Sequence, residues 1–324
     1  MARIVMTPPL TWVTSEQRAG PRDEELPGLI FEVSRQISGW LVIGFVVSSL
    51  LNVGLTQKPS NFRKHLQNGH FLSRMVLANL VLFPAVMVMA VTMVDLEPPY
   101  AAGLLVYGLS AGAPFLIALT RESRDDISLA ATVMTVLIIG TVVLMPLILP
   151  RLLEGVSVDV WAIIRGLALQ MILPMVLGMA IRQHLVPLAA LIQPWVAKIS
   201  SLALYGLLAT MIVGYLPQMV DPELWKALAT GLVVILVGLF IGYMMGDGHN
   251  HLKRVGALAT AQRNTAAAMI VASSNFDDPR VVVVVTLVNT AGLVVLMGAA
   301  KLMARDAEFL LTPIGADIPE QRAP

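Results

Sequence analysis

Arg263 is the residue of this sequence whose chemistry is most constrained by its surroundings, because it lies at the centre of an apolar stretch from Val255 to Phe276. A charge at the centre of a membrane helix costs about 2.5 kcal/mol or more, so another group must compensate it. No Asp or Glu lies deep in any apolar stretch of the chain. Two interpretations stay open: a structural arginine that donates to carbonyl groups of another broken helix, or a guanidinium that binds a carboxylate or other anion in a cavity.

Two runs of residues interrupt apolar stretches. Gly108-Leu-Ser-Ala-Gly-Ala-Pro114 combines helix-weakening residues with a proline, and Ala259-Thr-Ala-Gln-Arg-Asn-Thr265 is the longest polar run in any stretch. Backbone at membrane depth leaves helical geometry only where protein or a water-filled cavity satisfies it. Both runs therefore predict broken helices that face a shared cavity. The candidate substrate contacts are Arg263 as anion anchor, with Gln262, Asn264, Thr265, Ser110, Gly112 and Pro114 around it.

The composition places the chain in a membrane. Of its 324 residues, 56% are hydrophobic and 13% are charged, and the mean hydropathy is +0.77. Soluble proteins carry about 25% charged residues, so a soluble fold is excluded. The formal net charge of +1 gives no reason to expect nucleic acid as a partner. The sequence has no cysteine, which excludes disulfides and thiolate metal sites.

Nine stretches are long enough to cross a bilayer, which takes roughly 20 apolar residues of helix. Their hydrophobicity is continuous rather than alternating, which favours helices over barrel strands. The predicted fold is therefore all-α and polytopic. The predicted spans are Gln36 to Gln57, Met75 to Val94, Pro98 to Thr120, Ile127 to Pro150, Val160 to Ile181, Ile199 to Val220, Ala227 to Gly246, Val255 to Phe276 and Val281 to Ala300.

These spans divide the chain into two halves. Residues 36–150 carry spans one to four and residues 151–303 carry spans five to nine, between a polar amino-terminal tail, 1–35, and a carboxyl-terminal cytoplasmic tail, 304–324. The positive-inside rule places the amino terminus outside and the carboxyl terminus inside the cytoplasmic membrane. The basic residues on the predicted inner side are Lys58, Arg63, Lys64, Arg74, Arg121, Arg124, Arg182, Lys198, Lys253 and Arg254.

Each interrupted span is the penultimate one of its half, and in this orientation the two cross the membrane in opposite directions. Such an arrangement is typical of secondary transporters built from inverted repeats, in which interrupted helices at matching positions mark the binding site. The sequence therefore predicts a carrier that works by alternating access.

Four stretches of the chain match motifs of a known family: Gly54-Leu-Thr with Asn61-Phe62, the run from Asn79 to Pro84, the segment from Gly108 to Leu119 followed by Ser128, Thr132 and Thr135, and Gln262-Arg-Asn264. In this order and spacing the chain resembles the bile acid:sodium symporter superfamily from about Ser38 to Met303. The resemblance implies a core domain and a panel domain that rock against each other, nine helices, and transport of a small organic anion, commonly with two sodium ions bound beside the crossover.

The chain departs from the family at the residues that would bind sodium. The family's ion-binding Glu falls at Ala259, its Gln at Arg263, and its Ser-Asn pair at Pro114-Phe115. The side chains that could still offer oxygen atoms to an ion are those of Asn79, Ser128, Thr132, Gln262 and Asn264. A fixed guanidinium would repel sodium strongly in a low dielectric. One hypothesis is that Arg263 replaces a bound cation, which would make the protein a proton-coupled, uniport or exchange carrier.

Three other functions are weighed and set aside. Gly108-Leu-Ser110-Ala-Gly112 matches the Gly-x-Ser-x-Gly pattern of serine hydrolases, but every histidine falls in a predicted loop, out of reach of a buried nucleophile. His249 and His251 lie close to Asp247, yet three ligands in a solvated loop rarely hold a metal without a fourth. A channel or a membrane sensor has no supporting motif. We therefore expect that the protein is not an enzyme and holds no resident metal or cofactor. Sodium is the candidate coupling ion.

Overall fold

The computed structural model describes residues 22–56, 65–152, 160–214, 221–246, 248–276 and 278–311, and the regular secondary structure of these residues is helical. This confirms the all-α prediction. The elements are α1 (Arg22–Thr56), α3 (Gly69–Leu77), η2 (Ala78–Leu82), α4 (Phe83–Val94), α5 (Pro98–Leu109), α6 (Leu116–Glu122), α7 (Ile127–Leu152), α8 (Val160–Leu167), η3 (Ala168–Ile172), α9 (Leu173–His184), α10 (Val186–Gly214), α11 (Pro222–Met245), α12 (Asn250–Ala261), α13 (Thr265–Asn275) and α14 (Pro279–Leu311).

Several of these helices, alone or joined end to end, have the length and hydrophobicity of membrane spans. Six segments of the described chain are long and apolar enough to cross a bilayer: Gly69–Val94, Ile127–Leu152, Ile163–His184, Val186–Leu207, Pro222–Met245 and Pro279–Arg305. Helix α1 adds a shorter apolar part, Trp40–Thr56. Two further predicted spans are divided into the pairs α5/α6 and α12/α13. The chain is therefore a multi-pass helical membrane protein.

Three helix boundaries lie more than ten residues from those expected from the sequence. Helix α1 begins at Arg22, inside the segment predicted as a polar tail, and α14 continues to Leu311. Helix α10 begins at Val186 rather than at Ile199 and ends at Gly214; residues 215–220 lie outside the described ranges. The sequence-based start was wrong because it treated Lys198 as a helix boundary. The Lys198 ammonium lies 5.9 Å from the Trp195 ring on an exposed face, and a long cationic side chain of this kind is tolerated within a helix.

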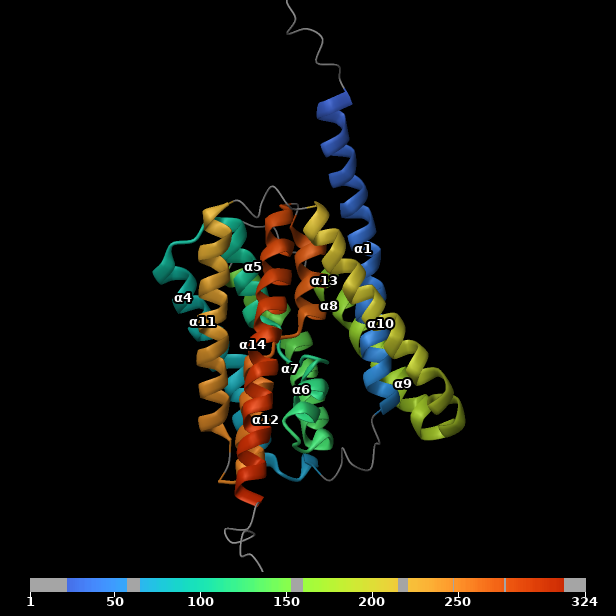
Figure 1. The fold of residues 1–324 in the computed structure, drawn as a ribbon, viewed down its shortest axis with the longest axis vertical. Helices are drawn as coiled ribbons and strands as arrows, with labels where there is room; N and C mark the ends of the chain where they lie inside the picture. The colour runs from blue at the N-terminus through green and yellow to red at the C-terminus, as the bar shows by residue number, and fades with distance from the viewer. Residues whose placement is uncertain are drawn as a thin grey trace, which may run out of the picture.

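The helices form two groups. Helices α1, α9 and α10 pack against one another and stand to one side of the remaining bundle (Figure 1). We call these three helices the side group. Helices α4, α5, α7, α11, α12 and α14 form the main bundle, with α6 and α13 at its edge. Within the side group, α1 and α9 approach closely at Gly54 and Gly178, where an added Cβ would lie under 3 Å from the facing backbone. Small residues at such positions are the usual means of packing membrane helices.

One end of the main bundle is held together by polar contacts between helix starts. The Tyr100 hydroxyl on α5 donates to Asp221, which precedes α11, at 2.6 Å. Arg280 at the start of α14 forms ion pairs with Glu97 and Asp278, each at 2.8 Å. The hydrogen bond from Tyr100 is the main cause of a lowered pKa at Asp221. These contacts join α5, α11 and α14 at the end that the sequence predicts to face outside.

Candidate functional site

The two interrupted helices meet at their breaks. Helix α5 ends at Leu109 and α6 begins at Leu116, while α12 ends at Ala261 and α13 begins at Thr265. Asn264 joins the breaks, since its backbone N–H donates to the Ser110 carbonyl and its side-chain Nδ2 donates to the Gly112 carbonyl, both at 2.8 Å. Its Oδ1 accepts from the Ala267 N–H at 3.1 Å and so caps α13. The two runs therefore meet as predicted, and the hydrogen bonds of Asn264 connect them.

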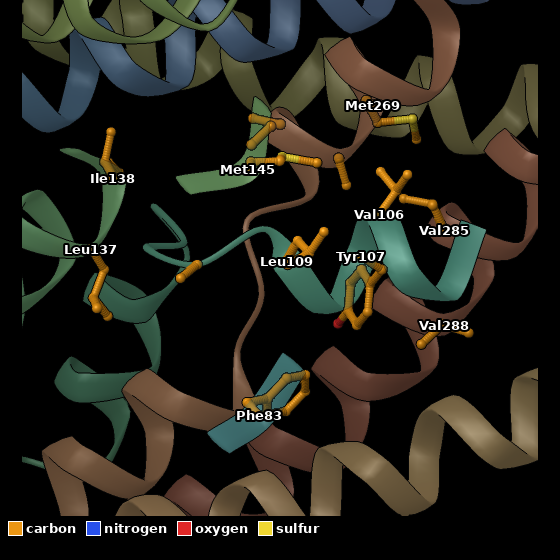
Figure 2. Close-up of a cluster of buried hydrophobic side chains, with 14 of the residues drawn as sticks. Phe83, Val106, Tyr107, Leu109, Leu137, Ile138, Met145, Met269, Val285 and Val288 are labelled. Carbon is orange, nitrogen blue, oxygen red and sulfur yellow. The ribbon is translucent and has the colours of Figure 1, made fainter. Parts of the chain in front are cut away.

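Ser110 and Gly112 lie in the protein interior rather than in a cavity. The Ser110 hydroxyl is fully buried and donates to the Val106 carbonyl at 2.7 Å. Gly112 has a positive φ of 79°, and its Cβ position would lie 2.5 Å from the backbone nitrogen of Ile138. Figure 2 shows the surrounding apolar side chains, with Val106, Tyr107 and Leu109 at the end of α5 and Ile138 and Met145 on α7. Neither residue is among those that line the cavities described below, and both are packed inside the break.

Gly112→Ala is expected to destabilise the folded protein by roughly 2 kcal/mol or more, because it combines a left-handed backbone with an overpacked site. The measurement is the unfolding temperature of the detergent-purified protein. Gly298→Ala on α14 is the matched control, since nothing lies within 4 Å of its Cβ position. Equal unfolding temperatures for the two variants would contradict the packing described for the first break.

Arg263 is fully buried, and its guanidinium is held by oxygen atoms of the protein itself. Nη1 donates to Asn79 Oδ1 at 3.1 Å, and Nη2 donates to the Asn79 carbonyl at 3.2 Å and to the Gly108 carbonyl by a short bond. The Phe83 ring lies 4.2 Å from the guanidinium carbon, which adds a cation–π contact. Among the described residues no carboxylate pairs with Arg263, and its Nε has no acceptor. These contacts are those of the structural interpretation of Arg263, and the residue also belongs to the lining of a narrow cavity at the second break.

The side chain of Asn79 is fixed so that its oxygen faces the guanidinium. Its Nδ2 donates to the Met75 carbonyl and to the Thr260 hydroxyl oxygen, both at 3.0 Å. An amide has one donor end and one acceptor end, so these two bonds leave Oδ1 for Arg263. Asn79 lies in η2, a π-helical turn in the middle of a span, which is a common feature of functional sites.

A cavity lies between the side group and the first break. Its wider part has a volume of about 340 Å³, within the range typical of small-molecule sites. Of the lining residues, Arg121 alone carries a charge, and Asn52, Gln193, Ser200 and Ser201 are polar. Apolar surface comes from both sides, including Phe45 and Leu204 from α1 and α10 and Pro114 and Phe115 from the break. The cavity therefore offers one cation, several hydrogen-bonding groups and an apolar wall.

A second, narrower cavity adjoins this one at the second break. It has a volume of about 30 Å³, shares Phe45 and Pro114 with the wider part, and is also lined by Gln262, Arg263, Thr265 and Asn289. Gln262 Nε2 donates to Asn289 Oδ1 and to the Arg263 carbonyl, each at 3.2 Å. Its Oε1 is buried and has no donor within the described ranges. Gln262, Thr265 and Pro114, which the sequence predicts around a shared cavity, line this space together.

Among the candidate ion ligands, the described contacts join Ser128 and Thr132 but do not bring them together with Asn79 or Gln262. Asn79 faces Arg263, and Gln262 faces Asn289. Thr132, on the second turn of α7, donates its hydroxyl to the Ser128 carbonyl at 2.9 Å, and the Ser128 hydroxyl is buried without a partner in the described part of the chain. Ser128 and Thr132 therefore form a second polar position, separate in its contacts from Asn79.

The alternative chemistries find no assembled site in the described residues. The buried Ser110 hydroxyl is donated to a backbone carbonyl, and its other described partner is the Met145 sulfur. His249 and His251 lie with ring centroids 5.6 Å apart, and Asp247 lies outside the described ranges. Groups of three or more potential metal ligands are absent from the residues that the structure describes.

Several cavity residues were missed by sequence reasoning. Arg121 was assigned to a loop, although it lies in the last turn of α6 and lines the cavity. Ser49 and Asn52 recur at helical spacing in an otherwise apolar stretch, as Gln193, Ser200 and Ser201 do less regularly on α10. Polar residues on one face of a membrane helix indicate a face turned away from lipid, and this signal would have identified both helices as cavity walls.

Comparison with known proteins gives two matches. The sequence model of the sodium bile acid symporter family matches residues 42–222. A probable sodium/metabolite cotransporter, BASS1 of the chloroplast of Arabidopsis thaliana, is 20% identical to this chain over 251 residues, which cover 74% of the chain and 60% of the relative. The chain thus spans about three fifths of the length of this curated relative. The match to the family includes the first break, Arg121 and Gln193, and ends before α12.

Proposed function

Since the chain belongs to the sodium bile acid symporter family, we propose that it is a secondary transporter that carries a small organic anion across the cytoplasmic membrane by alternating access. In this proposal α5/α6 and α12/α13 are the crossover helices of two inverted repeats, the chain crosses the membrane nine times, the amino terminus is outside and the carboxyl terminus is inside. The geometry of the breaks and the cavity supports this proposal, together with the distribution of basic residues.

The observation that carries the proposal is the cavity with a single cation at its wide end. Arg121 forms no described ion pair, and it is the one charged residue among the lining side chains. A guanidinium binds carboxylate, sulfonate or sulfate groups through two parallel hydrogen bonds. The anionic group of the substrate is therefore proposed to bind Arg121, with its apolar body against Phe45, Phe115 and Leu204.

The narrower cavity at the second break would form a hydrogen bond with the end of the substrate opposite to its charge. Gln262 Oε1 is an acceptor without a donor among the described residues. The two hydrogen bonds donated by Nε2 fix the side-chain amide in this orientation. An acceptor without a donor is expensive to bury, so a substrate hydroxyl or N–H is the group that best fits it. The proposed cargo is thus an amphipathic anion with a hydrogen-bond donor remote from its charge.

The transport step would be a movement of the side group against the main bundle. The cavity walls belong to different groups, α1 and α10 on one side and the first break with α6 on the other. Asn264 ties the two breaks together within the bundle, so the site stays fixed while the walls move relative to each other. Rocking of one bundle against a fixed midplane site is the general mechanism of inverted-repeat carriers.

The test is uptake of radiolabelled anions by proteoliposomes. Suitable probes are taurocholate, gluconate, benzoate and succinate, which differ in size, hydroxyl content and charge. A carrier gives saturable uptake and counterflow, in which unlabelled anion inside the vesicle accelerates entry of labelled anion. Large non-saturating currents would identify a channel instead, and absence of uptake for every probe together with absence of ligand-induced thermal stabilisation would contradict the proposal.

A further inference from the structure

The guanidinium of Arg263 is surrounded by protein oxygen atoms of the kind that bind a free cation. Its oxygen partners are Asn79 Oδ1, the Asn79 carbonyl and the Gly108 carbonyl, which come from two separate spans. Gly108 lies in the last turn of α5, whose carbonyl end carries partial negative charge. In membrane transporters the carbonyl groups of broken helices and half-helix carboxyl ends commonly coordinate sodium. Here the same kind of ligand set surrounds a side chain of the protein.

Sodium does not fit beside this guanidinium. The names of the family and of the relative both refer to sodium, so the oxygen cluster at the breaks is the natural place to look for the ion. Asn79 Oδ1 cannot turn toward another ion without breaking the bonds of Nδ2 to Met75 and Thr260. No carboxylate among the described residues faces Arg263 to offset a second positive charge, which the guanidinium would repel strongly in a low dielectric.

The contacts around the cluster also give the guanidinium a positional role. Arg263 belongs to the second break, Gly108 precedes the first, and Asn79 belongs to η2, so these bonds connect three spans. Phe83, at the start of α4, closes the site from the side with its ring face. A bound cation in the same cluster would draw the same segments together. The Arg263 side chain therefore holds these spans together permanently, whereas an ion would hold them together only while it is bound.

We propose that Arg263 is a built-in cation that occupies the oxygen cluster of Asn79 and Gly108, so that anion transport by this chain proceeds without bound sodium at the breaks. The inference rests on the proposed transport function for its uptake arm only. In this form the carrier moves the anion as a uniporter or an exchanger, because the positive charge that balances the site never leaves the protein. Arg263 is a positioning residue, because its guanidinium is held by oxygen atoms of the protein itself.

The first experiment measures thermal unfolding and needs no substrate. Arg263→Ala opens the oxygen cluster, and we expect a clear loss in unfolding temperature that millimolar guanidinium or ethylguanidinium partly restores, whereas choline does not. The unsubstituted protein should gain nothing from guanidinium and should unfold at the same temperature in sodium and in choline chloride. Arg165→Ala is the matched control, since Arg165 also lies in an apolar stretch but is exposed; it should show no rescue.

The outcomes separate cleanly. If Arg263→Ala is as stable as the unsubstituted protein, or if guanidinium fails to raise its unfolding temperature, the built-in cation is refuted. If Arg263→Ala cannot be purified, the sodium titration of the unsubstituted protein decides, and specific stabilisation by sodium over potassium and choline would overturn the proposal.

The second experiment measures anion uptake by proteoliposomes with sodium or choline outside. We expect equal uptake under the two conditions. Two ligands that are thermodynamically coupled typically change each other's affinity by about 5-fold to 150-fold, so a loss of uptake of that size in choline would refute the proposal. Failure of every anion to enter would contradict the transport function, while the thermal measurement would still test the built-in cation.

Discussion

Arg121→Gln is expected to reduce anion uptake at least roughly tenfold while leaving the amount of folded protein unchanged. The glutamine keeps length and hydrogen-bonding capacity but removes the single positive charge from the cavity lining. A hydrogen bond to a charged group contributes about 1.5–3 kcal/mol, and about 1.4 kcal/mol corresponds to a tenfold change in affinity. The measurement is the concentration dependence of uptake, in which the loss should appear chiefly as a raised half-saturation concentration. Arg121→Lys should retain part of the uptake, because it keeps the charge without the planar fork.

Arg182→Gln supplies the control for this substitution. Arg182 lies in the last turn of α9, at the same predicted membrane face, but does not line the cavity. Its substitution should leave uptake unchanged. Equal uptake by Arg121→Gln and Arg182→Gln would show that a general positive surface, rather than a specific anion contact, is involved.

Asn264→Ala is expected to have the largest effect on folding among single substitutions at the breaks. It removes the cap of α13, which is usually worth about 1 kcal/mol. It also removes the donor that satisfies the buried Gly112 carbonyl, at a further cost of about 1–3 kcal/mol. The sum predicts a destabilisation of roughly 2–4 kcal/mol, seen as a lower unfolding temperature, and a loss of uptake because the two breaks are no longer held together.

Asn275→Ala is the matched control for Asn264→Ala. Asn275 is the same residue type at the other end of α13, and its Nδ2 donates to the Val271 carbonyl one turn earlier in the same helix. This local bond joins no separate segments, so its loss should change the unfolding temperature little. A comparable destabilisation by both substitutions would indicate that Asn264 acts only within α13.

Both breaks could be predicted from the sequence because their causes are local. Gly112 and Pro114 cannot continue a helix, and the polar run around Arg263 cannot face lipid. The predicted meeting of the two breaks is also present in the structure, through Asn264. Long apolar stretches gave most of the spans for the same reason, since each is recognised from consecutive residues alone.

The groups that the Arg263 guanidinium contacts could not be predicted, because they are remote from it in sequence. The sequence left a structural and an anion-binding role open, and only the folded chain brings Asn79 and Gly108 to the guanidinium. Arg121 was missed for a related reason. Arg121 lies in the last turn of a seven-residue helix, which is too short to be recognised by periodicity. The cavity that it lines is formed only where α6 faces α1 and α10.

The most direct test of the account is whether a transported anion protects the cavity between α1, α10 and the first break. The sequence has no cysteine, so Ser201→Cys, on the cavity wall, and Ser73→Cys, an exposed control outside it, each carry one reactive thiol. The account predicts that the anionic thiol reagent MTSES modifies Ser201→Cys, that this modification stops uptake, and that the best transported anion of the panel slows it while leaving Ser73→Cys unaffected. Modification of Ser201→Cys at the same rate with and without that anion would contradict the account.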